Sequence, residues 1–355
     1  MIVSNFDDIK ISAMAAAVSN NWTALSETSD EDEAVIKKFT KKTGVEGRYN
    51  AGVRQTTSDF CYAAAKAILD EKKVNVEEIG VLVFVTQTPD YRIPATACLL
   101  QDRLGLKSDC IAFDVNLGCS GFSYGLNIVA SILKASNSKK ALLLAGDTSA
   151  KIKSPKNNNK TTHSASMLFG DSGTATLIEL DRTAKPIGMI SKTDGSGFKA
   201  IIAPFGGWRN PDDPQDKNAS TMDDIAVFNF AISEVPDLLK ETMKLTNNTP
   251  DNYDCLVLHQ ANLFIMKNVA KRTGFGMDKT LISINKFGNT SSSSLPITLV
   301  NEYGDSDEEK EIHSLMCGFG VGLSWSTVDC YINTKDILPL VHTDEYFVDG
   351  YTSEE

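Results

Sequence analysis

The sequence lacks the paired cysteines that mark disulfide-rich domains and structural zinc sites. Its seven cysteines stand at positions 61, 98, 110, 119, 255, 317 and 330, and no two of them form a CxxC pair. An odd number of cysteines at irregular spacing argues against a disulfide framework and against a zinc site. We therefore expect no metal, and we expect a protein of the reducing cytoplasm.

Long apolar runs and a surplus of positive charge are also absent. No stretch of 18 apolar residues occurs, and the N-terminus, MIVSNFDDIK, has no basic region followed by an apolar one. We therefore expect neither a membrane span nor a signal peptide. With 35 basic and 46 acidic residues the net charge is −11. Such a chain repels phosphate, which argues against general nucleic-acid binding, although a local basic patch could still bind an acidic partner protein.

The chain does contain apolar, β-branched runs that alternate with helical patterns. Of its 355 residues 42% are hydrophobic, which is enough for a large core in two domains or in two halves of one. Helical patterns include Phe60–Leu69 and Gly121–Leu133. Buried strands are predicted at Ile79–Thr86, Ile111–Val115, Ala141–Ala145, Cys255–Leu258, Thr280–Ile284 and Ile312–Cys317. This alternation is typical of an α/β fold with covered sheets.

The six predicted strands form two sets with similar spacing, which indicates a duplication. The first set starts near residues 79, 111 and 141, and the second near 255, 280 and 312. In each set the middle strand runs into a polar turn with a glycine and then into a helix. We predict two pseudo-duplicated α/β halves, residues 1–181 and 182–333, followed by an acidic tail, residues 334–355. The tail is either disordered or docked on a partner subunit, and Lys151–Ser166 and Ala203–Ser220 are predicted to be surface loops.

Cys119 is the first candidate for chemistry, because it lies at a strand-to-helix turn among small residues. A thiol at a helix N-terminus faces unpaired N–H groups and the positive end of the helix dipole, and both favour the reactive thiolate. The alternative is an ordinary buried cysteine that packs as a small hydrophobe.

His259 and Asn289 are the other two candidates. His259 directly follows a predicted strand, at the end where α/β folds present functional groups, although it could equally be a satisfied structural histidine. Asn289 occupies the place in the second half that Cys119 occupies in the first, although it could simply cap a helix. Duplication would bring these turns together, beside a glycine-rich segment, residues 317–325, whose backbone N–H groups could face an oxyanion.

Taken together, these segments resemble the β-ketoacyl-acyl carrier protein synthase III family of the thiolase superfamily. The resemblance lies in the motifs LGCSGF, HQAN, GNTSSSSLP and GFGVGLSW, with support from FGDSGTATL, DGSGF and VFNFAISEVP. They follow one another in the family's order and cover the chain to about Ile332. The resemblance implies a thiolase-like fold with αβαβα layers, a typical homodimer and no metal or redox cofactor.

The resemblance also implies a role for each matching residue. Cys119 matches the nucleophile that accepts an acyl group, and His259 and Asn289 match the pair that binds the carbonyl of the second thioester. The backbone N–H groups of Cys119 and Val321 match an oxyanion hole. Other matching positions are Phe228 and Asn262, which would line the pantetheine channel, and Ile93, which would cap the partner's acyl pocket.

The chain departs from the family where substrates are held. Asp32 or an inserted residue stands in place of a Trp, and Lys42 in place of an Arg, which argues against the family's usual grip on an adenine ring. Phe264 replaces an Arg used for carrier docking. Lys267, Lys271 and Arg272 on the same predicted helix could still meet acyl carrier protein, or could form an ordinary solvated face. These changes favour a specialised member whose donor comes from a carrier protein or whose acceptor is unusual.

The sequence therefore supports three hypotheses. The first is a decarboxylative Claisen condensation with a malonyl-type thioester on a carrier protein, after an acyl group has been loaded on Cys119. The second is transfer of that acyl group to an amine or hydroxyl acceptor. The third is a non-catalytic partner subunit, which the retention of Cys119, His259 and Asn289 argues against.

Overall fold

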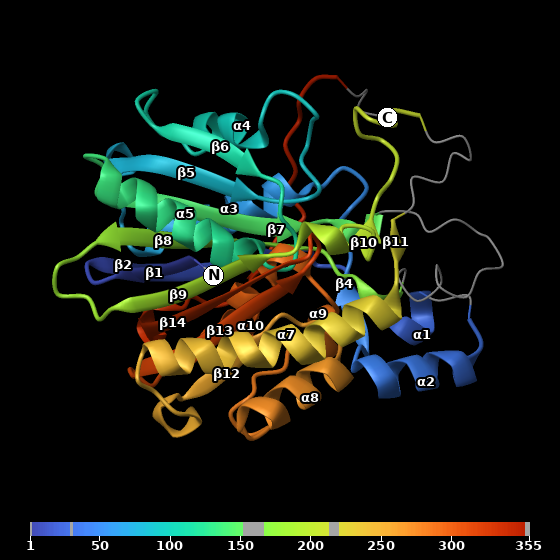
Figure 1. The fold of residues 1–355 in the computed structure, drawn as a ribbon. Coiled ribbons are helices and arrows are strands. Elements are labelled where there is room, and N and C mark those ends of the chain that lie inside the picture. Colours follow the sequence, from blue (N-terminus) through green and yellow to red (C-terminus); the bar gives the residue numbers. More distant parts are fainter. Residues whose placement is uncertain (1, 29–30, 152–166, 213–219, 352–355) are drawn as a thin grey trace.

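The computed structural model describes residues 2–28, 31–151, 167–212 and 220–351, and two stacked sheets dominate them (Figure 1). One sheet has six strands in the order β15-β2-β8-β7-β5-β6, and the other has five in the order β1-β9-β14-β13-β12. The six strands are β15 (Val341–His342), β2 (Ile9–Val18), β8 (Ser172–Leu180), β7 (Lys140–Asp147), β5 (Ile79–Val85) and β6 (Ile111–Val115). The five are β1 (Ile2–Phe6), β9 (Ile187–Thr193), β14 (Ser324–Asn333), β13 (Glu311–Gly320) and β12 (Cys255–Leu258).

Helices form the three remaining layers. The layer between the sheets contains α5 (Gly121–Ala135) and α10 (Ser294–Tyr303), because α5 contacts strands of both sheets and α10 contacts β2, β12 and β13. The outer face of the six-stranded sheet is covered by α3 (Thr57–Glu71) and α4 (Thr96–Arg103). On the other outer face α7 (Asp224–Leu245) packs on the five-stranded sheet and α8 (Leu263–Thr273) packs on α7, along the lower side of Figure 1. The expected αβαβα layering is thereby confirmed.

Shorter elements lie at the periphery of these layers. The helices α1 (Leu25–Thr28), α2 (Glu33–Thr43) and α9 (Ile284–Phe287) accompany two small ribbons, β3 (Trp22–Ala24) with β4 (Gly47–Tyr49) and β10 (Ile201–Ile202) with β11 (Thr221–Met222). The predicted surface loop at 203–220 connects β10 to β11, and its described residues include the exposed Trp208. The other predicted loop, Lys151–Ser166, lies outside the described residues after Lys151. Among the described helices none is long and apolar enough to cross a membrane.

The helix between the sheets shows how the sequence pattern produces this packing. The buried apolar side chains of α5 recur at helical spacing, at Phe122, Leu126, Val129, Ala130 and Leu133. Together with side chains of both sheets they form one core cluster, while two further clusters lie under the outer helices. Each fully buried large apolar side chain stabilises the fold by about 1.5–3 kcal/mol.

The two sheets repeat one topology, which supports the predicted duplication. In the first, β5 pairs in parallel with β7, β7 antiparallel with β8, and β8 antiparallel with β2. In the second, β12, β13, β14 and β9 make the same sequence of pairings. Helices α5 and α10 then correspond to one another, as do the turns that precede them. The division of the chain at residues 181 and 182 stays a prediction.

One predicted strand, Thr280–Ile284, is wrong. This segment lies where β6 lies in the first sheet, but it makes only a single parallel bridge, between Thr280 and Leu256. The side chain of Gln260 then replaces strand pairing, because its Oε1 accepts hydrogen bonds from the backbone N–H groups of Ser283 (2.9 Å) and Ile284 (3.1 Å). Helix α9 begins at Ile284.

The chain ends are exchanged between the sheets. Strand β1 pairs with β9 in the five-stranded sheet, whereas β15 pairs with β2 in the six-stranded sheet. After β15, the described part of the tail contacts residues of the first half. The Tyr91 Oη donates to Asp349 (2.6 Å), and the Phe347 N–H donates to Asp59 (2.9 Å). The described tail is therefore packed against the N-terminal part of its own chain.

Candidate active site

Cys119 lies just before α5, at the end of that helix where backbone N–H groups have no helical partner. Ser120 is the N-cap residue and the helix begins at Gly121. The Cys119 side chain is buried, with 8% of the residue exposed. The turn with Cys119 lies against β13 and against the segment after Asn289: a Cβ built at Gly320 would lie 2.8 Å from the sulfur, and one built at Gly118 would lie 3.2 Å from the Ser291 Oγ. The turn is therefore enclosed by segments that lie far from it in the sequence.

Burial dominates the acidity of this thiol. It raises the pKa of Cys119 to about 12, and the charge of Asp147 raises it further, whereas the hydrogen bonds from Val321, Cys119 and Ser291 lower it. The N–H donors favour the thiolate, as expected, but burial outweighs them and raises the pKa of the thiol. The expectation of a favoured thiolate is therefore wrong. In the enclosed site the resting group is the thiol.

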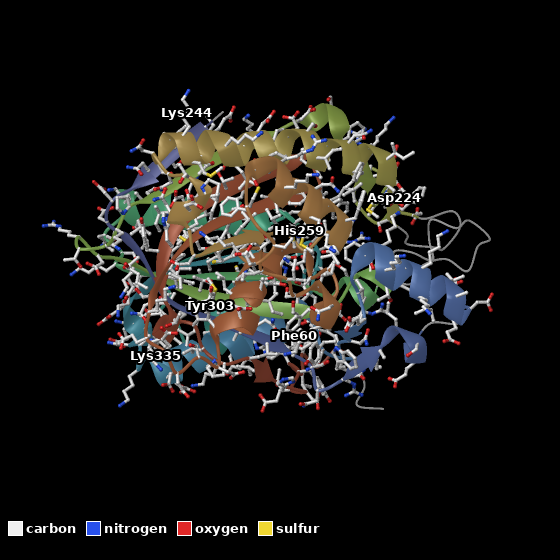
Figure 2. The ribbon with its side chains drawn as sticks, turned by 90° about the horizontal axis from the view of Figure 1, so that it is seen from below. Phe60, Asp224, Lys244, His259, Tyr303 and Lys335 are labelled. Atoms are coloured by element: carbon white, nitrogen blue, oxygen red, sulfur yellow. The ribbon has the colours of Figure 1, made fainter. Side chains whose placement is uncertain are left out.

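His259 follows β12 directly, and its ring is held as a neutral imidazole. The residue is 2% exposed, and burial lowers the pKa of His259 to about 3. Its Nδ1 lies 3.0 Å from the Ser294 Oγ, which itself receives a hydrogen bond from the Thr290 hydroxyl. The Ser294 hydroxyl can donate to Nδ1, and in that tautomer the ring proton is on Nε2. In the view of Figure 2, His259 projects near the centre of the molecule.

Asn289 is fixed by its backbone and by one side-chain atom. Its N–H donates to the Leu168 carbonyl (2.8 Å), and its carbonyl accepts from Gly170 (3.1 Å). Its Oδ1 accepts from the Ser291 N–H (2.9 Å), which leaves the amide Nδ2 as the unused donor. No residue in the described part of the chain receives a hydrogen bond from this Nδ2 or from the His259 Nε2.

The short helix η5 (Ser291–Ser293) and its neighbours connect all three candidates. The Ser291 Oγ lies 3.2 Å from the position of a Cβ built at Gly118, next to Cys119, and the Ser291 N–H donates to Asn289, while the Ser294 Oγ lies 3.0 Å from the His259 Nδ1. Contacts at the end of β13 independently place His259 near Cys119. The Phe319 ring packs edge-on against His259, with centroids 5.5 Å apart, and the next residue, Gly320, abuts Cys119. The structure therefore brings the three predicted residues to one site.

Gly320 is a position where only glycine fits. A Cβ built there would lie 2.7 Å from the Cys119 Cβ and 2.8 Å from its sulfur. The missing side chain lets β13 approach the thiol and brings the following residue, Val321, to it.

The residues expected to contact substrate lie on surrounding elements. Phe228 is on α7, and its ring stacks on that of Phe264 at the start of α8, with centroids 5.5 Å apart and planes 16° apart. Asn262 is the N-cap of α8, where its Oδ1 accepts from the Ile265 N–H (2.8 Å). Ile93 is 77% exposed in the loop after β5. Its side chain therefore points away from the core of this chain.

The expected carrier-docking residues share one helix. Lys267, Lys271 and Arg272 are all on α8 and all exposed, and Arg272 donates to the Ile232 carbonyl (2.7 Å). The Phe264 ring precedes them and is 52% exposed. Phe264, which stands where the family has an Arg, therefore forms an aromatic pair with Phe228 at the surface.

A surface hollow of about 560 Å³ lies between β9, β14 and α5. It is lined by Tyr124, Lys192, Thr193 and Trp325, among others, and by none of the three candidates. This hollow is therefore separate from the site around Cys119, which is 8% exposed.

Sequence reasoning missed two residues of this site, Asp147 and Ser291. Asp147 ends β7 and is fully buried, and a carboxylate that closes an apolar strand, as in KALLLAGD, is a signal that could have found it. Ser291 lies within a run of four serines, and nothing in that run distinguishes it from its neighbours.

Two family models match the chain. The model described as 3-oxoacyl-[acyl-carrier-protein (ACP)] synthase III matches residues 113–195, and the model of the C-terminal part of the same enzyme matches residues 243–330. The first match spans the turn with Cys119, and the second includes His259, Asn289 and Val321.

Whole-chain comparisons give a consistent result. The beta-ketoacyl-[acyl-carrier-protein] synthase III of Caldanaerobacter subterraneus subsp. tengcongensis is 33% identical over 306 residues, which are 85% of this chain and 89% of that protein. The protein of the same name from Neisseria gonorrhoeae is 29% identical over 90% of this chain and 98% of its own. Among solved structures, the 3-oxoacyl-(acyl-carrier protein) synthase from Burkholderia xenovorans LB400 superposes with a TM-score of 0.91 at 31% identity, over 96% of this chain and 99% of that one.

Proposed function

The chain belongs to the 3-oxoacyl-[acyl-carrier-protein] synthase III family of acyl-transferring condensing enzymes, and from this we propose the roles of its own residues. Cys119 accepts an acyl group from a thioester, and the acyl-enzyme then condenses with a malonyl-type thioester on acyl carrier protein, with loss of CO₂. The observation that carries this proposal is the convergence of Cys119, Asn289 and His259 on η5 and its neighbours. The only reactants are the two thioesters, so the reaction needs no cofactor.

In the loading step the backbone N–H groups of Cys119 and Val321 stabilise the oxyanion. Attack of the sulfur on the thioester carbonyl places negative charge on its oxygen, and two fixed donors lower the energy of that state. The support is that Gly320 abuts Cys119, so that the next residue, Val321, lies beside the Cys119 turn. The resting group is a thiol, so loading also requires that the thiol proton be removed.

In the condensing step His259 and Asn289 bind the carbonyl of the second thioester. Loss of CO₂ leaves an enolate on that carbonyl, and two N–H donors stabilise it. The neutral His259 supplies Nε2–H and Asn289 supplies Nδ2–H, because Ser294 and Ser291 engage the opposite atom of each side chain. A neutral imidazole can serve as such a hydrogen-bond donor to a carbonyl oxygen.

We also propose where the substrate and the carrier protein bind. We place the pantetheine arm beside Phe228 and Asn262, and an acidic carrier protein against Lys267, Lys271 and Arg272. The aromatic pair that includes Phe264 then lies between the carrier surface and the arm. Charge complementarity would mainly accelerate the encounter and fix its orientation.

We also infer a homodimer in the cytoplasm. Strand β6 is the unpaired edge of the six-stranded sheet, and Ile111 on it is 49% exposed. An open edge strand of this kind is a ready surface for pairing with a second copy. The exposed Ile93 would reach the acyl pocket of that partner. All seven cysteines are in the described part of the chain and all are free thiols, which supports a reducing compartment.

The second candidate function is acyl transfer from Cys119 to an amine or hydroxyl acceptor. It is favoured by the departures at Asp32, Lys42 and Phe264, which argue for an unusual donor or acceptor. This reaction needs no decarboxylation, so release of CO₂ from malonyl carrier protein distinguishes the two. A non-catalytic partner subunit remains the most remote reading, because the complete set of three residues is retained.

The test is intact-protein mass spectrometry after incubation with acyl-coenzyme A and acyl-carrier thioesters of increasing chain length. We expect a stable adduct on Cys119, and we expect Cys119→Ala to abolish it. His259→Ala should still load but should release no CO₂ from malonyl carrier protein. Loading that is lost entirely in His259→Ala contradicts the division of roles, and a chain that no thioester acylates contradicts the proposed function.

A further inference from the structure

The segment that follows β15, residues 343–349, is bound along its own chain although it has no regular secondary structure. We call it the tail strap. The buried Gln55 amide donates to the carbonyls of Thr343 (2.9 Å) and Glu345 (3.1 Å). The Thr343 N–H donates to the Val18 carbonyl (2.9 Å). The matched family model ends at residue 330, so the family match assigns no role to this segment.

Phe347 of the tail strap packs on a buried ion pair. The Arg103 guanidinium at the end of α4 pairs with the Asp59 carboxylate of α3 at 3.0 Å, and their side chains are 11% and 3% exposed. The same guanidinium lies over the rings of Tyr62 and Phe347, with its central carbon 4.5 and 4.9 Å from their centroids. The Phe347 N–H donates to the same Asp59 oxygen that Arg103 contacts (2.9 Å). Because a cation attracts an aromatic ring most strongly where water is excluded, this ion pair is a firm anchor for the strap.

This ion pair is linked to the loop between β5 and α4, residues 86–95. Arg103 donates to the Ser58 hydroxyl (3.2 Å), and that hydroxyl donates to the Asp90 carboxylate (2.7 Å). Phe347 is therefore connected to the loop through two side chains, one from each of the helices α3 and α4.

Asp349 of the tail strap holds the next residue of this loop directly. The Tyr91 hydroxyl donates to the Asp349 carboxylate at 2.6 Å. This hydrogen bond raises the pKa of Tyr91 to about 12, so the hydroxyl keeps its proton at neutral pH. Phe347 and Asp349 thus act on two consecutive residues of the loop, just before the exposed Ile93.

Tyr346 attaches the tail strap to a different part of the first half. Its hydroxyl accepts from the Arg54 guanidinium (3.1 Å), and that guanidinium lies over its ring, 5.6 Å from the centroid. Arg54 precedes α3 and is not part of the loop between β5 and α4. Tyr346 and Tyr91 therefore each supply a hydroxyl to a contact of the strap, but only the contact of Tyr91 involves the loop.

We propose that the tail strap determines which acyl chains the enzyme accepts, because Phe347 and Asp349 fix the 86–95 loop and thereby the position of Ile93. This inference rests on the proposed function, in which Ile93 caps the acyl pocket of a partner subunit. Phe347 and Asp349 are positioning residues that act through the loop. A loop that is held just before Ile93 keeps this cap in one place, whereas a released loop opens locally and lets the cap give way to a longer acyl chain.

Acyl selectivity in full-length variants tests the tail strap. Tyr91→Phe removes the donor of one hydrogen bond, and Asp349→Ala removes its acceptor. We expect each to raise the loading rate of Cys119 with dodecanoyl relative to butanoyl N-acetylcysteamine thioesters several-fold, measured by intact-protein mass spectrometry. The double variant should change selectivity no more than either single variant, because all three lack the same bond.

Two further variants separate this bond from general effects of substitution. Tyr346→Phe is the matched control, because it removes a hydroxyl of the same kind whose partner is Arg54, and it should leave selectivity unchanged. Asp349→Asn keeps an oxygen that can accept from Tyr91, so it should retain the original selectivity.

Hydrogen exchange measured by mass spectrometry reports on the loop without any substrate. The Asp90 N–H donates to the Thr96 hydroxyl (3.1 Å), so peptides from the loop contain a protected amide. Exchange of these peptides should be several-fold faster in Phe347→Ala and in Asp349→Ala, and unchanged in Tyr346→Phe.

The outcomes separate this inference from the proposed function. Unchanged selectivity in Tyr91→Phe and Asp349→Ala overturns it. A uniform loss of loading at both chain lengths, with a lower melting temperature and the same result in Tyr346→Phe, assigns the strap to general stability and overturns it as well. If Phe347→Ala does not fold, the Tyr91 and Asp349 variants decide alone. A chain that no thioester acylates contradicts the proposed function, whereas loading with unchanged selectivity in the variants contradicts only the strap.

Discussion

Two buried histidines in one sheet show how partners decide what a side chain does. His259 lies level with the carboxyl end of β13, where its N–H donates to the Cys317 carbonyl, and His313 lies near the start of the same strand. Five residues of strand, roughly 17 Å, separate the two levels. They are similarly enclosed, at 2% and 5% exposed. Burial alone therefore does not distinguish them.

Their hydrogen bonds differ in kind. His259 meets one hydroxyl, which can donate or accept, so the ring stays neutral and keeps one N–H for another molecule. His313 meets two acceptors: Nδ1 lies 3.0 Å from the Asn252 carbonyl, and Nε2 lies 2.6 Å from the Asp329 carboxylate. Both of its nitrogens therefore face acceptors, and its pair with Asp329 is buried. The first arrangement leaves a donor available for chemistry, and the second uses both donors for structure.

The environment of Asp329 completes this second arrangement. Its other oxygen accepts from the Tyr253 hydroxyl (2.5 Å) and the Asn248 amide (3.2 Å). Burial alone would raise the pKa of Asp329, but the hydrogen bonds from His313 and Tyr253 lower it below its ordinary value. The carboxylate is thus kept charged by its partners.

His313→Ala should have the largest effect. It leaves the buried Asp329 carboxylate without its partner at 2.6 Å, and we expect the free energy of unfolding to fall by about 3–5 kcal/mol. Urea denaturation followed by circular dichroism measures this change. His342→Ala is the control, because that exposed ring contacts a carbonyl, that of Ser19 at 3.4 Å, and the ring of Tyr49 at 5.6 Å between centroids, rather than a buried carboxylate. A loss below about 1 kcal/mol in His313→Ala would show that Asp329 does not need His313.

His259→Ala should instead act on turnover. Removal of one preorganised donor lowers the condensation rate by about 10²–10³-fold, equivalent to about 2.7–4 kcal/mol. The rate of CO₂ release from malonyl carrier protein measures it, with unfolding by urea recorded in parallel. The contrast between His259 and His313 is wrong if His259→Ala loses more stability than His313→Ala. It is also wrong if His259→Ala condenses at a rate within tenfold of that of the unchanged protein.

Tyr253→Phe should have an intermediate effect on stability. It removes one of two donors to the second Asp329 oxygen while the Asn248 amide stays, so we expect a loss of about 1.5 kcal/mol, the lower range for a hydrogen bond to a charged group. Urea midpoints measure it. Tyr331→Phe is the control, since that ring stacks on His313 at 4.0 Å without bonding Asp329. Equal losses in the two variants would show that the hydrogen bond from Tyr253 to Asp329 adds no stability beyond that of a tyrosine hydroxyl without this bond.

The smallest predicted effect is the change in the free energy of unfolding per pH unit. The pKa of His259 is about 3 in the fold and about 6.5 in the unfolded chain, so the unfolded state binds the proton first as the pH falls. Its contribution to stability is therefore complete above pH 6.5 and decreases by about 1.4 kcal/mol per pH unit below it. His259→Gln should show a shallower decline between pH 6.5 and 5 in urea titrations. Parallel declines in the two proteins would mean that His259 is already protonated in the fold.

The sequence was sufficient for the layered fold and for the three residues around the thiol, for physical reasons. Strands buried on both faces read as unbroken apolar runs, and functional groups cluster where such strands end, so Cys119 and His259 stood out. Asn289 was found because it follows the equivalent strand position in the second half. These features are local in sequence or depend on its periodicity.

The features that the sequence did not predict depend on long-range contacts. Thr280–Ile284 has a strand pattern, but the Gln260 amide, twenty residues earlier, takes the hydrogen bonds a strand would have made. Cys119 precedes a helix, which favours a thiolate, but the depth of its burial is set by both sheets together. Asp147 and Ser291 lie at the site only because η5 packs against the end of β7. None of these facts is contained in the spacing of residues along the chain.

The exchange of the outermost strands ties the molecule together. The first strand of the chain completes the sheet of the second half, and β15, near the end of the described chain, lies on the sheet of the first half. A cut between the halves would leave each fragment without a strand that the other holds, so neither fragment is a self-sufficient unit. Unfolding should accordingly proceed in one cooperative step, and the geometry around Cys119, assembled from both halves, is lost or kept as a whole.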